Sequence, residues 1–157
     1  MPDMLVKLYP LPPIENEIAL QKSLGITIRR GLPPEKHFVL DWIGRHFSRY
    51  WVSETDVAFS REPVSVWLAL AGDGDLCGFA CYDTTARGFF GPTGVCETMR
   101  GRGTGRALLL ACLHAMHDVG YGYAIIGAAG PVDYYRKTVG AQVIEDSLAT
   151  MRASTPR

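Results

Sequence analysis

The sequence has no excess of charge of either sign, because sixteen lysines and arginines balance sixteen acidic residues among 157. A neutral chain offers no electrostatic attraction to nucleic acid or to an anionic membrane, so neither is an expected partner. No apolar run is long enough to span a bilayer, and the first residues lack the basic start and apolar stretch of a signal peptide. These absences predict a cytoplasmic protein.

Cysteine is scarce, and the four thiols show no Cys-x-x-Cys spacing. They fall in apolar or strand-like segments, at Cys77, Cys81, Cys96 and Cys112. This pattern is typical of reduced, buried thiols and argues against a disulfide framework or a zinc site. His114 and His117 stand three residues apart on a predicted helix, but no third ligand is evident. We therefore expect no metal, and the two histidines are interpreted as solvated.

Length and composition indicate a single domain over residues 1–157. A hydrophobic content of 47% with 20% charged residues is ordinary for a globular protein. A short strand at residues 4–9 and a helix at residues 14–23 form an N-terminal addition, residues 1–25, whose role the sequence does not show. Residues 154–157 are expected to form a frayed tail.

Beyond this addition, hydrophobic periodicity and turn residues predict a succession of strands and helices. The strand at residues 88–95 is unusual, because its glycines and Pro92 weaken pairing with a neighbour and indicate a bulge or a splayed strand. Ser53 is the predicted N-cap of the second helix. The expected strands are residues 26–29, 64–71, 76–82, 88–95, 121–126, 143–144 and 148–151, and the expected helices are residues 35–47, 53–59, 104–119 and 133–138.

A glycine-rich segment runs directly into the third of these helices, with the sequence Arg-Gly-Arg-Gly-Thr-Gly-Arg-Ala over residues 100–107. Glycine lacks a Cβ, and the start of a helix carries unpaired amides and the positive end of the helix dipole. Such a loop is suited to a phosphate or pyrophosphate. The spacing excludes a P-loop, which needs a Lys-Ser/Thr pair, and a dinucleotide fingerprint, whose third glycine would fall on Arg106 or Leu108.

The remaining pattern, Arg-x-x-Gly-x-Gly followed by Arg-Ala, resembles the acetyl-coenzyme A pyrophosphate loop of the GNAT superfamily of N-acetyltransferases. The bland alternative is a flexible basic surface turn. The element order resembles the GNAT fold over residues 26–152, and the resemblance is most specific over residues 88–141, where Tyr-Tyr-Arg-Lys and Val-Gly-Ala match the family's closing helix. It implies an α+β fold of three layers, in which a mixed sheet with splayed strands lies between helices.

The resemblance also implies where acetyl-coenzyme A would bind as the acyl donor. Pantetheine is expected in the gap between the strand before the loop and the strand after the helix, against Val95, Cys96 and Glu97. An amide near Val95 could polarise the thioester carbonyl, on which negative charge grows. Many relatives carry an asparagine that helps to hold the cofactor where this chain has Gly-Ala-Ala-Gly, residues 127–130, so that contact is not expected here. The pyrophosphate is expected on Arg100, Gly101, Arg102, Gly103, Thr104, Gly105 and Arg106.

Acetyl transfer needs a proton donor for the leaving thiolate and a proton acceptor for the attacking amine. By resemblance, Tyr135 is the general acid; alternatively its ring only positions the cofactor, and Tyr134 is expected in the core. The family often places a glutamate base on the strand before the loop, but residues 88–95 hold no carboxylate. Three acids remain as base candidates, namely Asp83, Glu97 and Asp56.

The first two helices are expected to build the acceptor side, where aromatic residues and acids suit a cationic amine. A small-molecule or peptide amine is therefore the expected acceptor, and a homodimer through residues 1–25 is compatible with the resemblance. Two other functions stay open: a non-catalytic acyl-coenzyme A sensor, and a phosphate-binding protein unrelated to acyl transfer. The acceptor-side residues are Trp42, Phe47, Tyr50, Trp51, Phe59, Glu54 and Asp56.

Overall fold

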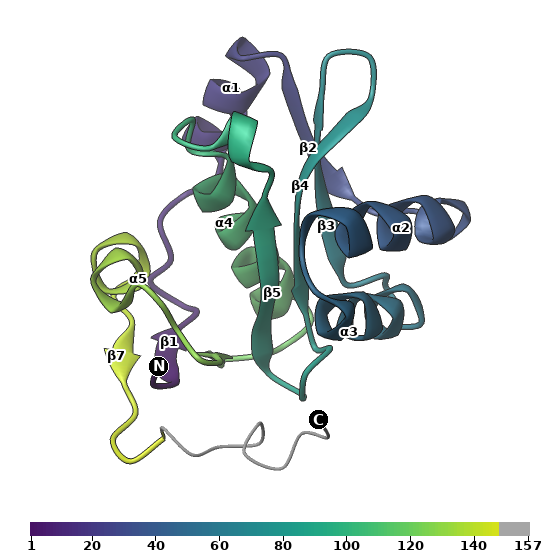
Figure 1. The fold of residues 1–157 in the computed structure, drawn as a ribbon. Helices are drawn as coiled ribbons and strands as arrows, with labels where there is room; N and C mark the ends of the chain where they lie inside the picture. Colours follow the sequence, from purple (N-terminus) through teal and green to yellow (C-terminus); the bar gives the residue numbers. More distant parts are fainter. Residues whose placement is uncertain (148–157) are drawn as a thin grey trace.

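The computed structural model describes residues 1–147, which form one mixed sheet with helices on both faces (Figure 1). The predicted strand at residues 148–151 and the predicted tail at residues 154–157 lie outside the described residues. The strands are β1 (Met4–Lys7), β2 (Ile26–Arg30), β3 (Val66–Ala71), β4 (Asp75–Tyr82), β5 (Phe89–Val95), β6 (Tyr123–Ile126) and β7 (Gln142–Val143). The helices are α1 (Glu15–Ser23), α2 (Lys36–His46), α3 (Arg49–Phe59), α4 (Thr104–Asp118) and α5 (Val132–Val139), with 3-10 turns η1 (Pro33–Glu35) and η2 (Glu97–Met99).

The three-layer arrangement is the one expected (Figure 1). Helices α2 and α3 cover one face of the sheet, and α4 lies against the other face. Each face of the sheet packs against its own hydrophobic cluster. Helix α4 is buried on most of its sides, whereas α2 buries only one stripe of residues. The buried stripe of α2 is narrow: Val39, Trp42 and Ile43 are buried, but Phe38 is 49% exposed.

The strand order is β2-β3-β4-β5-β6-β1-β7, and only the pair of β5 and β6 is parallel among the described strands. Strands β3 and β4, both expected as strands, form an antiparallel hairpin in which β4 is buried from Leu76 to Tyr82. The register between β4 and β5 shifts between Ala80 and Tyr82. The sheet therefore carries the predicted irregularity next to β5.

Strand β5 parts from β6 soon after the two meet. Phe89 pairs with Ile125 and Phe90 with Ile126, and no further pair joins these strands although β5 continues to Val95. The predicted splay is confirmed. It leaves one edge of β5 open where the glycine loop and α4 follow.

The glycines of β5 have a packing reason as well. A Cβ at Gly94 would lie 2.5 Å from Cζ of Phe47, so only glycine lets this ring rest on the strand. Phe47 also packs against Trp51, with ring centroids 5.0 Å apart, and against Phe79 at 5.8 Å. The ring of Phe47 therefore packs directly on β5, and Trp51 packs on that ring.

The N-terminal addition is part of the sheet. Strand β1 lies between β6 and β7 and is antiparallel to both, so it completes the sheet beyond the splay. Helix α1 then crosses back to pack on β2 and α4, beside the segment that precedes α4 (Figure 1). Among the described residues, no helix is long and apolar enough to cross a membrane.

Helix α3 begins earlier than predicted. Its N-cap is Ser48, whose Oγ accepts a hydrogen bond from the backbone N–H of Trp51 at 3.4 Å, whereas Ser53 lies inside the helix. Ser48 has the extended backbone typical of an N-cap. The link from α2 to α3 is therefore only two residues long, Phe47 and Ser48. Tyr50 and Trp51 belong to the first turn of α3 and not to a loop.

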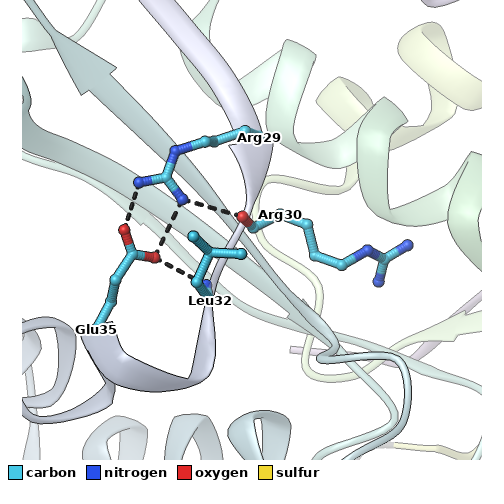
Figure 2. Close-up of polar contacts among 4 residues, drawn as sticks. All are labelled: Arg29, Arg30, Leu32 and Glu35. Atoms are coloured by element: carbon cyan, nitrogen blue, oxygen red, sulfur yellow. Dashed lines mark hydrogen bonds and ion pairs between the residues drawn. The ribbon is translucent and has the colours of Figure 1, made fainter.

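The entry to α2 is fixed by polar contacts of Glu35 (Figure 2). Its carboxylate forms an ion pair with the guanidinium of Arg29 on β2 and accepts the backbone N–H of Leu32 at 2.8 Å. The Arg29 guanidinium also donates to the carbonyl oxygen of Arg30 at 3.1 Å. The hydrogen bond from Arg29 lowers the pKa of Glu35, which keeps this carboxylate charged. These contacts tie the helix to the edge of the sheet.

Candidate acyl-coenzyme A site

The glycine loop has the backbone that anion binding requires. Gly101 and Gly103 adopt positive φ angles of 79° and 77°, which side chains with a Cβ rarely tolerate. Gly103 is the N-cap residue of α4 and supplies no capping side chain. The first amides of α4 are therefore available to a ligand. Arg100 adds positive charge beside them, whereas Arg106 forms an ion pair with Glu17 of α1, with Nε and Oε1 2.8 Å apart.

A cavity of about 560 Å³ opens from this loop along β5 to the start of α5. Its volume lies in the range of small-molecule sites. It includes most of the predicted cofactor contacts but not Cys96, Glu97 or Arg102. The predicted residues that line it are Val95, Arg100, Gly101, Gly103, Thr104, Gly105, Arg106 and Tyr135, joined by Phe90, Thr93, Gly94, Met99, Leu109, Pro131 and Tyr134.

The backbone of Val95 faces the open edge of β5. The next amide, that of Cys96, donates to the carbonyl oxygen of Cys77 on β4 at 2.8 Å. Successive amides of a strand point to opposite edges, so the N–H of Val95 is directed away from β4. The Val95 carbonyl oxygen accepts from Nε of Arg100 at 3.1 Å. This edge can therefore offer a main-chain donor to an extended ligand.

A second cavity of about 220 Å³ shares Phe90, Thr93 and Tyr135 with the first. Trp51 of α3 and Thr85 line it, as does the small-residue turn after β6, residues 127–130. The glycines and alanines of that turn, where the asparagine is missing, thus form one wall of this smaller cavity. Tyr135 is thus common to the linings of both cavities.

Tyr135 is 8% exposed, and its burial raises its pKa to about 12. The phenol therefore keeps its proton at neutral pH, as a proton donor must. Tyr134 is not a core residue as expected: it is 37% exposed and lines the larger cavity. The two rings pack edge to face with centroids 5.1 Å apart. Both tyrosines of the pair thus face the candidate site.

The structure does not bring the predicted base candidates to Tyr135. Asp83 is buried elsewhere, where its carboxylate accepts the N–H of Gly88 at 2.7 Å and the hydroxyl of Tyr121 at 2.9 Å. Glu97 is exposed on η2. Asp56 is exposed and forms an ion pair with Lys36 at 2.6 Å. Among the described residues, no acid lines either cavity.

Two acids are hydrogen-bonded to residues that line the smaller cavity: Asp3, whose Oδ1 accepts the backbone N–H of Ala128 at 2.8 Å, and Glu54. The Oε1 of Glu54 accepts the hydroxyl of Thr85 at 2.6 Å, and Thr85 lines that cavity. The sequence pattern assigned Glu54 only to the acceptor side, because nothing in it indicated that the turn after β4 would meet α3. A correct prediction of where α3 begins would have placed Glu54 on the same side of that helix as Trp51, three residues earlier.

Comparison with known proteins agrees with this geometry. A profile described as the acetyltransferase (GNAT) family matches residues 33–141, which is more than half of the chain. The chain therefore belongs to the GNAT acetyltransferase family. Residues 1–25 lie outside the match. A search of curated proteins found no match.

Several solved structures share the fold. One is a fungal multi-domain GH3 β-N-acetylglucosaminidase with a GCN5-related glucosamine N-acetyltransferase region (14% identity, TM-score 0.74, covering 91% of this chain and 19% of that one). GCN5-related N-acetyltransferases from Sphaerobacter thermophilus (23%, 0.68, 91% and 48%) and Kribbella flavida (21%, 0.59, 90% and 53%) are also similar. This chain spans about half the length of the two bacterial proteins and less than a fifth of the length of the fungal one.

Proposed function

We propose that this protein is an N-acetyltransferase that transfers the acetyl group of acetyl-coenzyme A to a primary amine of a small-molecule or peptide acceptor. The observation that carries the proposal is one continuous cavity. It joins the amides at the start of α4 to the open edge of β5 and ends at Tyr135. A pyrophosphate, an extended pantetheine arm and a thioester require these three environments in this order.

The chain's own groups account for binding. The amides from Gly101 to Arg106 would hold the pyrophosphate, with Arg100 adding charge at the rim of the cavity. The open edge of β5 would hold the pantetheine amides by main-chain hydrogen bonds, as an added strand does. Bound acetyl-coenzyme A supplies a thioester carbonyl that an amine can attack. The N–H of Val95 is the donor proposed to polarise that carbonyl.

Tyr135 is the proposed general acid. Tyr135 lines both cavities, and its phenol, whose pKa burial raises to about 12, is protonated at neutral pH and can donate to a thiolate that leaves from the larger cavity. The presence of Tyr135 in the linings of both cavities, rather than its pKa, is the stronger support. A ring that only packed on the cofactor would need no access to the smaller cavity.

The smaller cavity is the proposed acceptor site, with Glu54 as the proton acceptor acting through Thr85. A primary amine there could pass a proton to the Thr85 hydroxyl as that hydroxyl gives its own proton to Glu54. The indole of Trp51 on the cavity wall would favour a cationic amine. Asp83 and Glu97 are not proposed as bases, because neither lines the cavity or contacts a residue that the structure brings to it.

A non-catalytic acyl-coenzyme A sensor remains the second candidate function. The observation that favours it is the absence of any acid from the lining of both cavities among residues 1–147. A sensor would bind the cofactor without turnover of any amine. A phosphate-binding protein would bind nucleotides that lack pantetheine equally well.

Two measurements separate these functions. Calorimetry with coenzyme A and with adenosine 3′,5′-bisphosphate should show clearly tighter binding of coenzyme A, because pantetheine adds the contacts along β5. Thiol release from acetyl-coenzyme A across a panel of primary amines should then show turnover with small cationic amines. Binding without turnover of any amine would favour the sensor. Equal affinity for both ligands would favour the phosphate-binding protein.

A further inference from the structure

The glycine loop is supported from behind by a residue outside the matched family region. Gln21 of α1 is a fully buried polar side chain with an exposed fraction of 0%. Its Nε2 donates to the carbonyl oxygen of Arg102 at 2.8 Å, and its Oε1 accepts the hydroxyl of Thr104 at 2.7 Å. Both ends of the side-chain amide are thus bonded to the loop that is proposed to hold pyrophosphate.

The contact with Arg102 determines how the following amide points. The carbonyl of Arg102 and the N–H of Gly103 belong to one planar trans peptide, in which C=O and N–H point in opposite directions. Because the carbonyl is directed at Gln21, the N–H of Gly103 must be directed away from α1. Gly103 lines the larger cavity.

Glycine on this peptide makes such a support necessary. Gly103 follows the peptide and has no Cβ to restrict its φ angle, so the Arg102–Gly103 peptide can rotate at a lower steric cost than it could before any other residue. Rotation would direct the carbonyl of Arg102, a hydrogen-bond acceptor, toward a bound anion. The carbonyl of Arg102 can only accept, so it fixes Nε2 as the end of the Gln21 amide that faces it, and Oε1 is left to accept the hydroxyl of Thr104. In the buried environment of Gln21, a broken pair would leave polar groups unsatisfied.

We propose that Gln21 is a positioning residue that holds the Gly103 amide in the orientation needed to bind a pyrophosphate group. The inference rests on the proposed function, since it concerns the same loop. Under this proposal, α1 supports the glycine loop, a role that the sequence of residues 1–25 did not indicate. The role concerns the anion-binding loop, because the hydrogen bonds of the Gln21 amide are made with Arg102 and Thr104.

The test uses the full chain with Gln21→Met, which keeps a long buried side chain but removes both hydrogen bonds. Calorimetry should show coenzyme A binding about tenfold to hundredfold more weakly, the loss expected for one hydrogen bond to a charged group. Asn16→Ala is the matched control, because Asn16 is exposed on the same helix. It should leave the affinity unchanged within about twofold.

A measurement on the unaltered protein avoids dependence on variant folding. In ¹⁵N-labelled protein, the amide resonance of Gly103 should shift on addition of coenzyme A and also of inorganic pyrophosphate. In folded Gln21→Met, the Gly103 shift should be much reduced, whereas resonances along β5 should still respond to coenzyme A. If the unaltered protein binds coenzyme A and the Gly103 amide does not respond, the inference is overturned while the proposed function stands. If it does not bind coenzyme A, the proposed function itself fails.

Discussion

The hydroxyl of Thr85 donates to Oε1 of Glu54 at 2.6 Å and so connects an acid on α3 with the cavity beside Tyr135. Thr85 follows β4, and Glu54 lies thirty-one residues earlier in the chain. The pair offers a route for a proton out of a cavity that no acid among the described residues lines. A positively charged amine and a negatively charged Glu54 would also attract one another across Thr85.

Glu54→Gln should lower kcat/KM for amine acceptors at least tenfold, because the amide cannot accept a proton; general bases typically contribute about a hundredfold or more. The calorimetric affinity for coenzyme A should be unchanged, since Glu54 does not line the larger cavity. Asp56→Asn is the matched control on the same helix, where Asp56 is exposed and paired with Lys36. Equal losses in both variants would show a general charge effect instead of proton transfer.

Tyr135→Phe should lower kcat about a hundredfold and leave the coenzyme A affinity within about threefold, because only the hydroxyl is removed. Tyr134→Phe serves as the control, since its ring lines only the larger cavity. It should change kcat by less than about threefold. Full activity of Tyr135→Phe in steady-state acetylation assays would show that the ring merely packs on the cofactor.

The pH dependence follows from the pKa of Tyr135, which burial raises to about 12. The phenol therefore stays protonated over the working range, and kcat/KM should rise with pH as the acceptor amine loses its proton, without a falling limb below about pH 10. The same shift affects stability: the unfolded phenol titrates near pH 10, so the contribution of this group is complete below that pH and is lost as pH rises toward about 12. A falling limb near pH 8 that disappears in Tyr135→Phe would contradict the assigned pKa.

The sequence predicted the parts of the fold that depend on local pattern. The glycine loop, the helix behind it and the broken β5 were all readable, because glycine, proline and helical periodicity act through the neighbouring backbone. The predicted start of α3 was wrong. Phe47 and Trp51 face Phe79 on the sheet, and these tertiary contacts leave no helical periodicity in the local sequence.

The residues that were missed depend on contacts distant in sequence. Gln21 meets the loop eighty-one residues later, and its own helix is short and polar, so no motif marks it. Asp83 shows the opposite error. A carboxylate at the end of a strand resembles a solvated catalytic acid in sequence, but its partners Gly88 and Tyr121 make it a structural turn residue.

Asp83→Ala should therefore destabilise the protein by about 1–3 kcal/mol, because Gly88 N–H and the Tyr121 hydroxyl lose a buried acceptor. Asp83 also has a positive φ of 59°, which alanine tolerates less well than asparagine. Asp83→Asn should accordingly cost less. Both losses can be measured by denaturant unfolding. In either folded variant kcat/KM should stay within about twofold; a hundredfold loss in Asp83→Asn would return Asp83 to consideration as the base.

Gly94→Ala tests whether the aromatic cluster and β5 act as one unit. The new Cβ would lie 2.5 Å from Cζ of Phe47, a ring already packed against Trp42, Trp51 and Phe79, so it has little room to move. Overpacking of this kind costs about 1–3 kcal/mol. Because Trp51 lines the smaller cavity, which is the proposed acceptor site, a displaced Phe47 should also raise KM for the amine more than it changes the coenzyme A affinity.

A matched control for this substitution is Gly122→Ala, because nothing lies within 4 Å of a Cβ at that position. It should leave unfolding free energy and KM nearly unchanged. Adding Phe47→Leu to Gly94→Ala should recover part of the lost stability, since a smaller side chain removes the clash, and the double-mutant cycle should give a favourable coupling energy. Additive losses in that cycle would mean that Gly94 is required for the strand backbone alone and that Phe47 does not rest on it in solution.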